Sequence, residues 1–218
     1  PDQLSAELAG NGVVKGRCAG AFEPDVARGR GDQVQAADAV VHGADDIWHR
    51  GPVELTFSAV DTGSGGARTE ASLDGGLVWR EGRTLVVEEA GVHRILFRSL
   101  DKAGNVEPDR SCTVRIDTTR PTTVARAARV KRGRSVSLRY RVGDLAPEAS
   151  VRIVVKTARG KTVKTMALGQ RATNTDLKHR FTCRLQQGDY RYCVFATDPA
   201  GNAQKNAAFA KRVVVSGP

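Results

Sequence analysis

The sequence predicts an all-β protein that contains two β-sandwich domains in tandem. Apolar and polar residues alternate with a period of two along several short segments, a pattern typical of strands with one buried face. The 218 residues include 23 Gly and 8 Pro, which indicates frequent turns and favours short strands over long helices. A turn of the pattern Asp-x-Ala-Gly-Asn occurs at 101–105 and again at 198–202, so the same design is expected in both halves.

Four segments carry the alternation most clearly, two in each half of the chain. In each segment the residues of the inward phase end on an aspartate. They are Val53-Leu55-Phe57-Ala59-Asp61, Ile95-Phe97-Ser99-Asp101, Val136-Leu138-Tyr140-Val142-Asp144 and Tyr190-Tyr192-Val194-Ala196-Asp198. A hairpin is also expected from Val154 to Val163, around Arg159-Gly160. Short strands with frequent turns favour a sandwich in each half.

The turn residues and one proline define the domain organisation. In the repeated turn, Asp caps free backbone N–H groups, while Gly and Asn tolerate the left-handed conformation. The residues expected in these roles are Asp101, Gly104, Asn105, Asp198, Gly201 and Asn202. Pro121 rules out a central strand at 117–123. We therefore expect a linker or the remnant of a preceding domain at 1–33, one sandwich at 34–120 and a second at 121–218.

The formal net charge of +10 hides a strong asymmetry between the two halves. Residues 1–119 contain 13 Lys+Arg and 19 Asp+Glu (net −6), whereas residues 120–218 contain 21 and 5 (net +16). A charge of +16 favours a polyanionic partner such as a wall polymer or an acidic polysaccharide, and we do not expect nucleic acid. Neutralisation by the acidic half is the alternative. The candidate contacts are Arg126, Arg129, Lys131, Arg132, Arg134, Arg139 and Arg141.

The four cysteines indicate disulfides rather than a zinc site, because they form no C-x-x-C motif and no His lies at metal spacing. Cys183 and Cys193 flank a hairpin turn signal at 186–189. A three-residue loop places the two residues opposite each other, whereas the two-residue loop that Gly favours places them on opposite faces. We expect a Cys183–Cys193 disulfide, with Cys18–Cys112 as the residual pair. Buried thiols in a reducing cytosol are the alternative.

Several motifs in the first half occur together and in a fixed order. They are Asp-Thr-Gly-Ser-Gly (61–65), Leu-Asp-Gly-Gly (73–76), Asp-Lys-Ala-Gly-Asn (101–105) and Ile-Asp-Thr-Thr-Arg-Pro (116–121). With them, residues 35 to 121 resemble the bacterial Ig-like repeats of secreted and surface proteins. In the second half, residues 151–155, 160–163, 188–192 and 198–202 make 124–216 similar to the Ig-like module of flagellar hook-capping proteins.

These resemblances imply an Ig-like fold for both domains and an extracellular or cell-surface location. They also imply a non-catalytic spacer, stalk or adhesion module, usually attached to an enzyme or a surface protein, and they supply no ligand. No apolar run approaches the roughly 18 residues of a membrane helix, so no transmembrane segment is expected.

Motifs that carry catalysis are absent from the sequence. It contains no G-x-S-x-G, no H-E-x-x-H and no G-x-x-x-x-G-K-[ST] motif, so we do not expect an enzyme. His93 shares the inward phase of Ile95 and is expected in the core. Trp48 and Trp79 could stack on a sugar, although Trp48 is better placed to cover the core. The integrin-binding tripeptide at 30–32 (Arg-Gly-Asp) arises readily by chance in a sequence rich in Arg and Gly.

Carboxylates are expected to gather at one end of each sandwich. In an Ig-type sandwich the second and sixth strands run in the same direction, so their ends share one pole. This brings Asp61 and Asp101 together in the first domain, and Asp144 and Asp198 together in the second. The chain enters the second domain at the same pole, which places Asp117 nearby.

Three carboxylates at Asp117, Asp144 and Asp198 could hold calcium, which prefers oxygen ligands. However, calcium takes six to eight oxygens, and three carboxylates are few. Turn capping, or neutralisation by Arg120 and Arg141, explains the aspartates without a metal. We therefore expect no cofactor, with this calcium site as the alternative.

The sequence thus favours a non-catalytic structural, spacer or adhesion module of a secreted or cell-surface bacterial protein, with a protein or polymer as partner. The alternative is a polyanion- or carbohydrate-binding module attached to a secreted enzyme, which contacts its ligand through the basic second domain.

Overall fold

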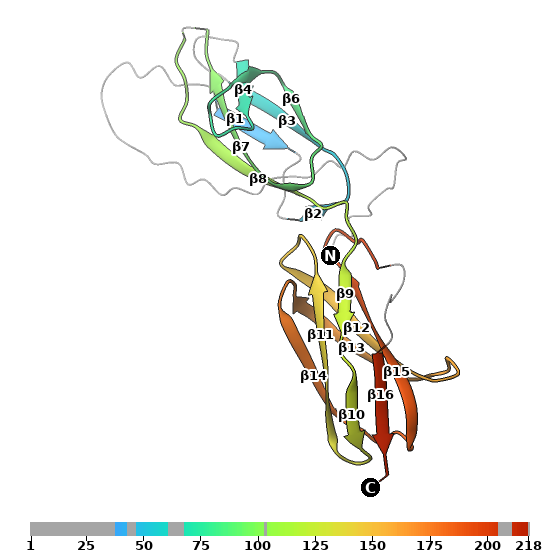
Figure 1. The fold of residues 1–218 in the computed structure, drawn as a ribbon. Coiled ribbons are helices and arrows are strands. Elements are labelled where there is room, and N and C mark those ends of the chain that lie inside the picture. Colours follow the sequence, from blue (N-terminus) through green and yellow to red (C-terminus); the bar gives the residue numbers. More distant parts are fainter. Residues whose placement is uncertain (1–37, 43–46, 61–67, 103, 205–210, 218) are drawn as a thin grey trace, which may run out of the picture. The chain divides into compact units, whose positions relative to one another are not determined.

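The computed structural model describes residues 38–42, 47–60, 68–102, 104–204 and 211–217, and every regular element in these ranges is a β-strand. The chain divides between Asp117 and Thr118 into two compact units, called here the first and second domains (Figure 1). The boundary lies three residues before the one expected from the sequence. Among the described residues, no helix is long and apolar enough to cross a membrane. The fold of the described ranges is all-β, as predicted.

The described residues of the first domain form eight strands in two sheets. They are β1 (Asp38–His42), β2 (Trp48–His49), β3 (Val53–Val60), β4 (Arg68–Ser72), β5 (Arg80–Glu81), β6 (Thr84–Val87), β7 (Gly91–Leu100) and β8 (Arg110–Ile116). One sheet has the order β1-β3-β6 and the other the order β2-β8-β7-β4-β5. Strand β2 pairs parallel to β8, and the other neighbours pair antiparallel.

The second domain repeats this arrangement strand for strand. Its strands are β9 (Thr122–Ala125), β10 (Ala128–Lys131), β11 (Ser135–Gly143), β12 (Glu148–Thr157), β13 (Thr162–Ala172), β14 (Asp176–Thr182), β15 (Gly188–Thr197) and β16 (Lys211–Ser216). The sheets are β14-β11-β9 and β10-β16-β15-β12-β13, with β10 parallel to β16. In each domain the first, third and sixth strands form one sheet and the other five strands form the second. Both domains are therefore Ig-like sandwiches.

Each core lies between the two sheets and is filled by the inward phases expected from the sequence. In the first domain, Leu55 and Ile95 are 0% exposed, and the rings of Phe57 and Phe97 pack with centroids 5.6 Å apart. In the second domain, Leu138 and Ile153 on facing sheets are 1% and 0% exposed. The predicted strand phases are confirmed, because a period of two separates the buried from the exposed face of a strand.

Two tyrosine hydroxyls stabilise the second sandwich from inside. At the start of β15, the Tyr190 hydroxyl donates to the carbonyl oxygen of Gln186 at 2.9 Å, which is the tyrosine corner of Ig-like domains. Two residues later, the Tyr192 hydroxyl shares its single proton between the carbonyl oxygens of Arg126 at 2.6 Å and Arg139 at 2.8 Å. Tyr192 thus connects its own sheet to the facing one, and burial raises its pKa to about 12.

The predicted Cys183–Cys193 disulfide is wrong, since both thiols are free. The expected hairpin does not exist, because β14 and β15 belong to different sheets and the segment between them crosses the sandwich. Cys183 is 0% exposed and lies in the core, whereas Cys193 alternates with Tyr192 and lies on the outer face of β15. Cys112 is buried in the first core, and Cys18 lies outside the described residues.

The hairpin expected from Val154 to Val163 is confirmed, because β12 and β13 pair antiparallel and Gly160 takes a left-handed φ of 86° in its turn.

The interpretation of His93 as a core histidine is wrong. Its ring is partly exposed and lies 2.8 Å from the carbonyl oxygen of Glu89, whereas His49 is buried, at 4% exposure.

Candidate functional site: the basic face of the second domain

The outer face of the β14-β11-β9 sheet concentrates positive charge. Along β11, Leu138 and Tyr140 point into the core, so the alternate residues Arg139 and Arg141 point outward and are exposed. The register places Arg139 opposite Lys178 of β14, and two pairs further along the strands, on the same face, Ser137 lies opposite Arg180. Cross-strand neighbours of this kind stand about 5 Å apart at Cβ, so the cations form one continuous row.

Arg126 extends this row beyond the end of β9. Its backbone N–H donates to the carbonyl oxygen of Arg139 at 2.9 Å, which continues the sheet by one residue. We call this surface the basic face. It consists of Arg126, Arg139, Arg141, Lys178 and Arg180, all exposed, together with the acidic Asp176.

A shallow depression of about 490 Å³ lies on the basic face and is lined by Arg126, Arg139, Tyr140, Asp176, Leu177 and Lys178. Beside it, a smaller depression of about 160 Å³ includes Val124 and Arg141. The floor residue Tyr140 is buried, which raises the pKa of its hydroxyl, and the positive charge of Arg171 opposes this shift. The depressions therefore expose guanidinium and ammonium groups beside a small apolar surface.

Positive charge also acts on His179 of β14. Burial lowers the pKa of this imidazole, and the charges of Arg171 and Lys164 lower it further. His179 is consequently neutral at neutral pH, so the positive charge of the sheet comes from Arg and Lys.

The structure separates the seven basic residues that the sequence put forward. Arg126, Arg139 and Arg141 lie on the basic face. Arg129 and Lys131 lie on β10 of the other sheet, and Arg132 and Arg134 lie in the turn that follows it. Sequence reasoning missed Lys178 and Arg180, although the alternation along 176–182 could have placed them on one side of a strand.

The basic face suits the recognition of repeated anionic groups. A guanidinium presents several N–H donors that match carboxylate, sulfate and phosphate oxygens in a bidentate manner. Alternate residues of a strand are about 7 Å apart, so Arg139 and Arg141 present such donors at regular spacing along β11. The basic face therefore offers charged hydrogen-bond donors at regular spacing along β11.

The turn residues expected from the sequence occupy two equivalent turns. Asp101 accepts a hydrogen bond at Oδ1 from the N–H of Asn105, and Asp198 accepts the same bond from Asn202, both at 2.8 Å. Gly104 and Gly201 take left-handed φ angles of 91° and 83° and donate to the aspartate carbonyl oxygens. These turns cap β7 and β15.

The three aspartates that the sequence suggested as a calcium site are divided between the two domains. Asp117 ends the first domain, where it is buried and its N–H donates to the carbonyl oxygen of His49 at 2.8 Å. Asp144 and Asp198 both belong to the second domain, and the structure brings carboxylate oxygens of the two within 4.8 Å of each other. Asp61 and the Arg-Gly-Asp segment lie outside the described residues.

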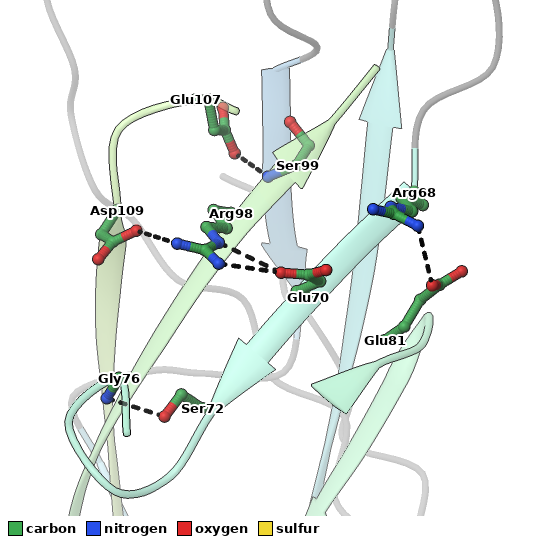
Figure 2. Close-up of polar contacts among 9 residues, drawn as sticks. All are labelled: Arg68, Glu70, Ser72, Gly76, Glu81, Arg98, Ser99, Glu107 and Asp109. Carbon is green, nitrogen blue, oxygen red and sulfur yellow. Dashed lines mark hydrogen bonds and ion pairs between the residues drawn. The ribbon is translucent and has the colours of Figure 1, made fainter. Parts of the chain in front are cut away.

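The tryptophan proposed for sugar stacking in the first domain is partly covered by an arginine. The guanidinium carbon of Arg98 lies 3.8 Å from the ring centroid of Trp79. Figure 2 shows how Arg98 is held: it donates to Glu70 from two nitrogens at 3.2 and 3.3 Å and pairs with Asp109 at 3.6 Å. The other candidate, Trp48, is half-buried in the short strand β2.

Comparison with known proteins gives no family. No family model matches the chain, and no curated protein matches it. Among solved structures, the Yersinia pseudotuberculosis adhesin InvE is similar at 13% identity and a TM-score of 0.38, covering 85% of this chain and 62% of that one. The fibronectin(III)-like modules of Clostridium thermocellum CbhA give 10% identity, a TM-score of 0.34 and coverage of 80% and 90%.

A tetra-tandem repeat from the extending region of a large adhesion protein is also similar. It has 16% identity and a TM-score of 0.37, and the match covers 82% of this chain and 48% of that chain. At these identities and TM-scores the likenesses assign neither a family nor an activity.

Proposed function

We propose that the chain is a non-catalytic Ig-like module that serves in structure, spacing or adhesion in a secreted or cell-surface bacterial protein. The observation that supports this most is the repetition of one eight-strand topology in two compact units, each with its own core. Such a chain adds length and surface without a catalytic centre. The sequence resemblance to Ig-like repeats of secreted and surface proteins points in the same direction.

The proposal is tested by measuring whether the chain chemically modifies the molecules that it binds. The full chain is incubated with a panel of labelled wall polymers, polysaccharides and matrix proteins, and both retention and product formation are measured by mass spectrometry. We expect each retained molecule to be recovered intact. A cleaved or modified product that appears at a rate proportional to the chain's concentration contradicts the proposal.

A second candidate function, binding of an acidic polymer through the second domain, is favoured by the basic face. Its five exposed cations lie on one sheet beside the acidic Asp176, in a half of the chain with a net charge of +16. Electrostatic attraction by such a surface is long-ranged at low salt and is screened at high salt. Binding should therefore weaken steeply as the salt concentration rises.

Charge reversal at matched positions tests this second candidate. The double variant R139E/K178E places two acids at the centre of the basic face, whereas R129E/K131E makes the same change in net charge on β10. Retention of each full-length protein on immobilised heparin and on a poly(glycerol phosphate) wall polymer is measured against salt. We expect R139E/K178E to elute at clearly lower salt than R129E/K131E. Equal shifts in the two variants contradict a role for the basic face, and retention no greater than that of a neutral protein removes the function.

A further inference from the structure

The two equivalent turns differ at the second oxygen of the aspartate. In the first domain, Asp101 Oδ2 accepts a hydrogen bond from the side-chain nitrogen of Asn105 at 2.6 Å. In the second domain, Asp198 is 5% exposed, and its buried Oδ2 has no hydrogen-bond partner among the described residues. A buried carboxylate oxygen without a partner is costly, so capping of the turn explains one oxygen of Asp198 and leaves the other unexplained.

The carboxylate of Asp144 lies beside the carboxylate of Asp198. The two residues belong to the same domain but follow strands of different sheets. Asp144 directly follows β11 and Asp198 directly follows β15, and carboxylate oxygens of the two residues lie within 4.8 Å of each other. Asp144 is held in place by its backbone, since Asn174 Nδ2 donates to its carbonyl oxygen at 2.6 Å and Ala146 N–H donates to its Oδ1 at 2.9 Å.

Two carboxylates so close together, one of them buried, repel each other unless a positive charge lies between them. Arg141, which the sequence suggested as a neutralising group, lies exposed on the basic face. Within the described part of the chain, Asp198 forms no ion pair with any Arg or Lys. A bound cation would place a positive charge beside Asp198 and supply the partner that its Oδ2 lacks among the described residues.

We propose that Asp144 and Asp198 bind a divalent cation of the calcium type at this end of the second domain. Both donors are carboxylate oxygens, which are hard ligands, whereas zinc prefers nitrogen and sulfur. Calcium accepts irregular geometry and completes its coordination with carbonyl oxygens and water. Because the site has few charged ligands, we expect a dissociation constant of about 10⁻⁴–10⁻³ M, the range of extracellular calcium modules. The site is independent of the polymer-binding function proposed above.

Thermal unfolding of the full chain in calcium chloride and in a chelator tests the proposal, with isothermal titration of the same metal salt as the direct binding measurement. At about 10 mM calcium, we expect the melting temperature of the second domain to rise by about 6–20 °C above its value in chelator. Sodium chloride at equal ionic strength measures the effect of screening alone.

The variants D198N and D144N remove one charge each and are expected to abolish the calcium response. The asparagine keeps an oxygen for the N–H of residue 202 or 146, so the turns persist and the melting temperature in chelator is expected to stay equal or to rise. D176N, an exposed acid of the same domain, is the matched control and keeps the full response. The proposal fails if calcium leaves the wild-type melting temperature and titration heat unchanged, or if D198N responds as the wild type does.

Discussion

Tyr192 and Arg126 are joined by two reciprocal hydrogen bonds: the tyrosine hydroxyl donates to the Arg126 carbonyl oxygen at 2.6 Å and accepts from the Arg126 N–H at 3.1 Å. Arg126 is also a member of the basic face. The backbone that positions this cation is therefore fixed from inside the core, by a side chain of the opposite sheet.

Replacement of this hydroxyl, Y192F, is expected to lower the free energy of unfolding of the second domain by about 1–3 kcal/mol. The change takes the hydroxyl away from the Arg126 carbonyl oxygen, whereas the Arg126 N–H and the Arg139 carbonyl oxygen lose one of their two bonds and keep the bond to each other. Urea unfolding followed by circular dichroism measures the loss. The comparison variant Y190F loses a single bond, to Gln186, and should cost about 1 kcal/mol. A Y192F protein as stable as the wild type would show that the bonds do not stabilise the fold.

The pKa of Tyr192 predicts alkaline destabilisation. In the folded domain this pKa is about 12, and in the unfolded chain it returns to about 10. Because the folded-state pKa is raised, the stabilisation is complete below pH 10 and is lost as the pH rises from about 10 to 12. The loss amounts to about 2–3 kcal/mol. The free energy of unfolding, measured across this pH interval, should fall steeply for the wild type and less steeply for Y192F. Equal slopes for the two proteins would show that another group is responsible.

In the first domain, R98K is expected to lower the free energy of unfolding by about 1–2 kcal/mol. Lysine cannot reproduce both the stacking on Trp79 and the planar donor pattern toward Glu70, and the Arg98 side chain is only 24% exposed. The exposed pair Arg68–Glu81 supplies the control, because R68K should cost about 0.5 kcal/mol or less. Trp79 fluorescence should change in R98K and not in R68K.

Because the thiols of Cys183 and Cys193 are free, we expect an alkylating reagent to modify both residues once the protein is unfolded, with no reductant added. Before unfolding, Cys183 should react far more slowly than an exposed thiol, because it is 0% exposed in the core. Mass mapping of the alkylated peptides checks both statements. Recovery of a peptide in which Cys183 and Cys193 are linked would contradict the structure.

The sequence predicts the strands and their buried faces well, because burial of one face imposes a period of two that Leu55, Ile95, Leu138 and Tyr192 all obey. It fails where a chain segment changes sheet. The turn signal after Cys183 suits a hairpin, yet β14 and β15 pair with different partners, and local spacing carries no information on that choice.

The basic face is predicted in part for the same reason. Arg126, Arg139 and Arg141 lie close in sequence, so their grouping is visible in the charge pattern. Lys178 joins them only through the pairing of β14 with β11, which brings it opposite Arg139. Likewise, the approach of Asp144 to Asp198 depends on two strands that end at the same pole of different sheets.

The parallel pairing of β10 with β16 sets how the second domain carries tension. These strands are the second and last of the domain, and four residue pairs join them, from Ala128–Val213 to Lys131–Ser216. A pull on the two ends of the domain acts first on β9, which pairs with β11; once β9 is detached, the pull drags β10 and β16 past each other lengthwise, so the bonds between these two strands are loaded together instead of opening one after another. A domain built in this way resists stretching much better than one whose terminal strands can unzip.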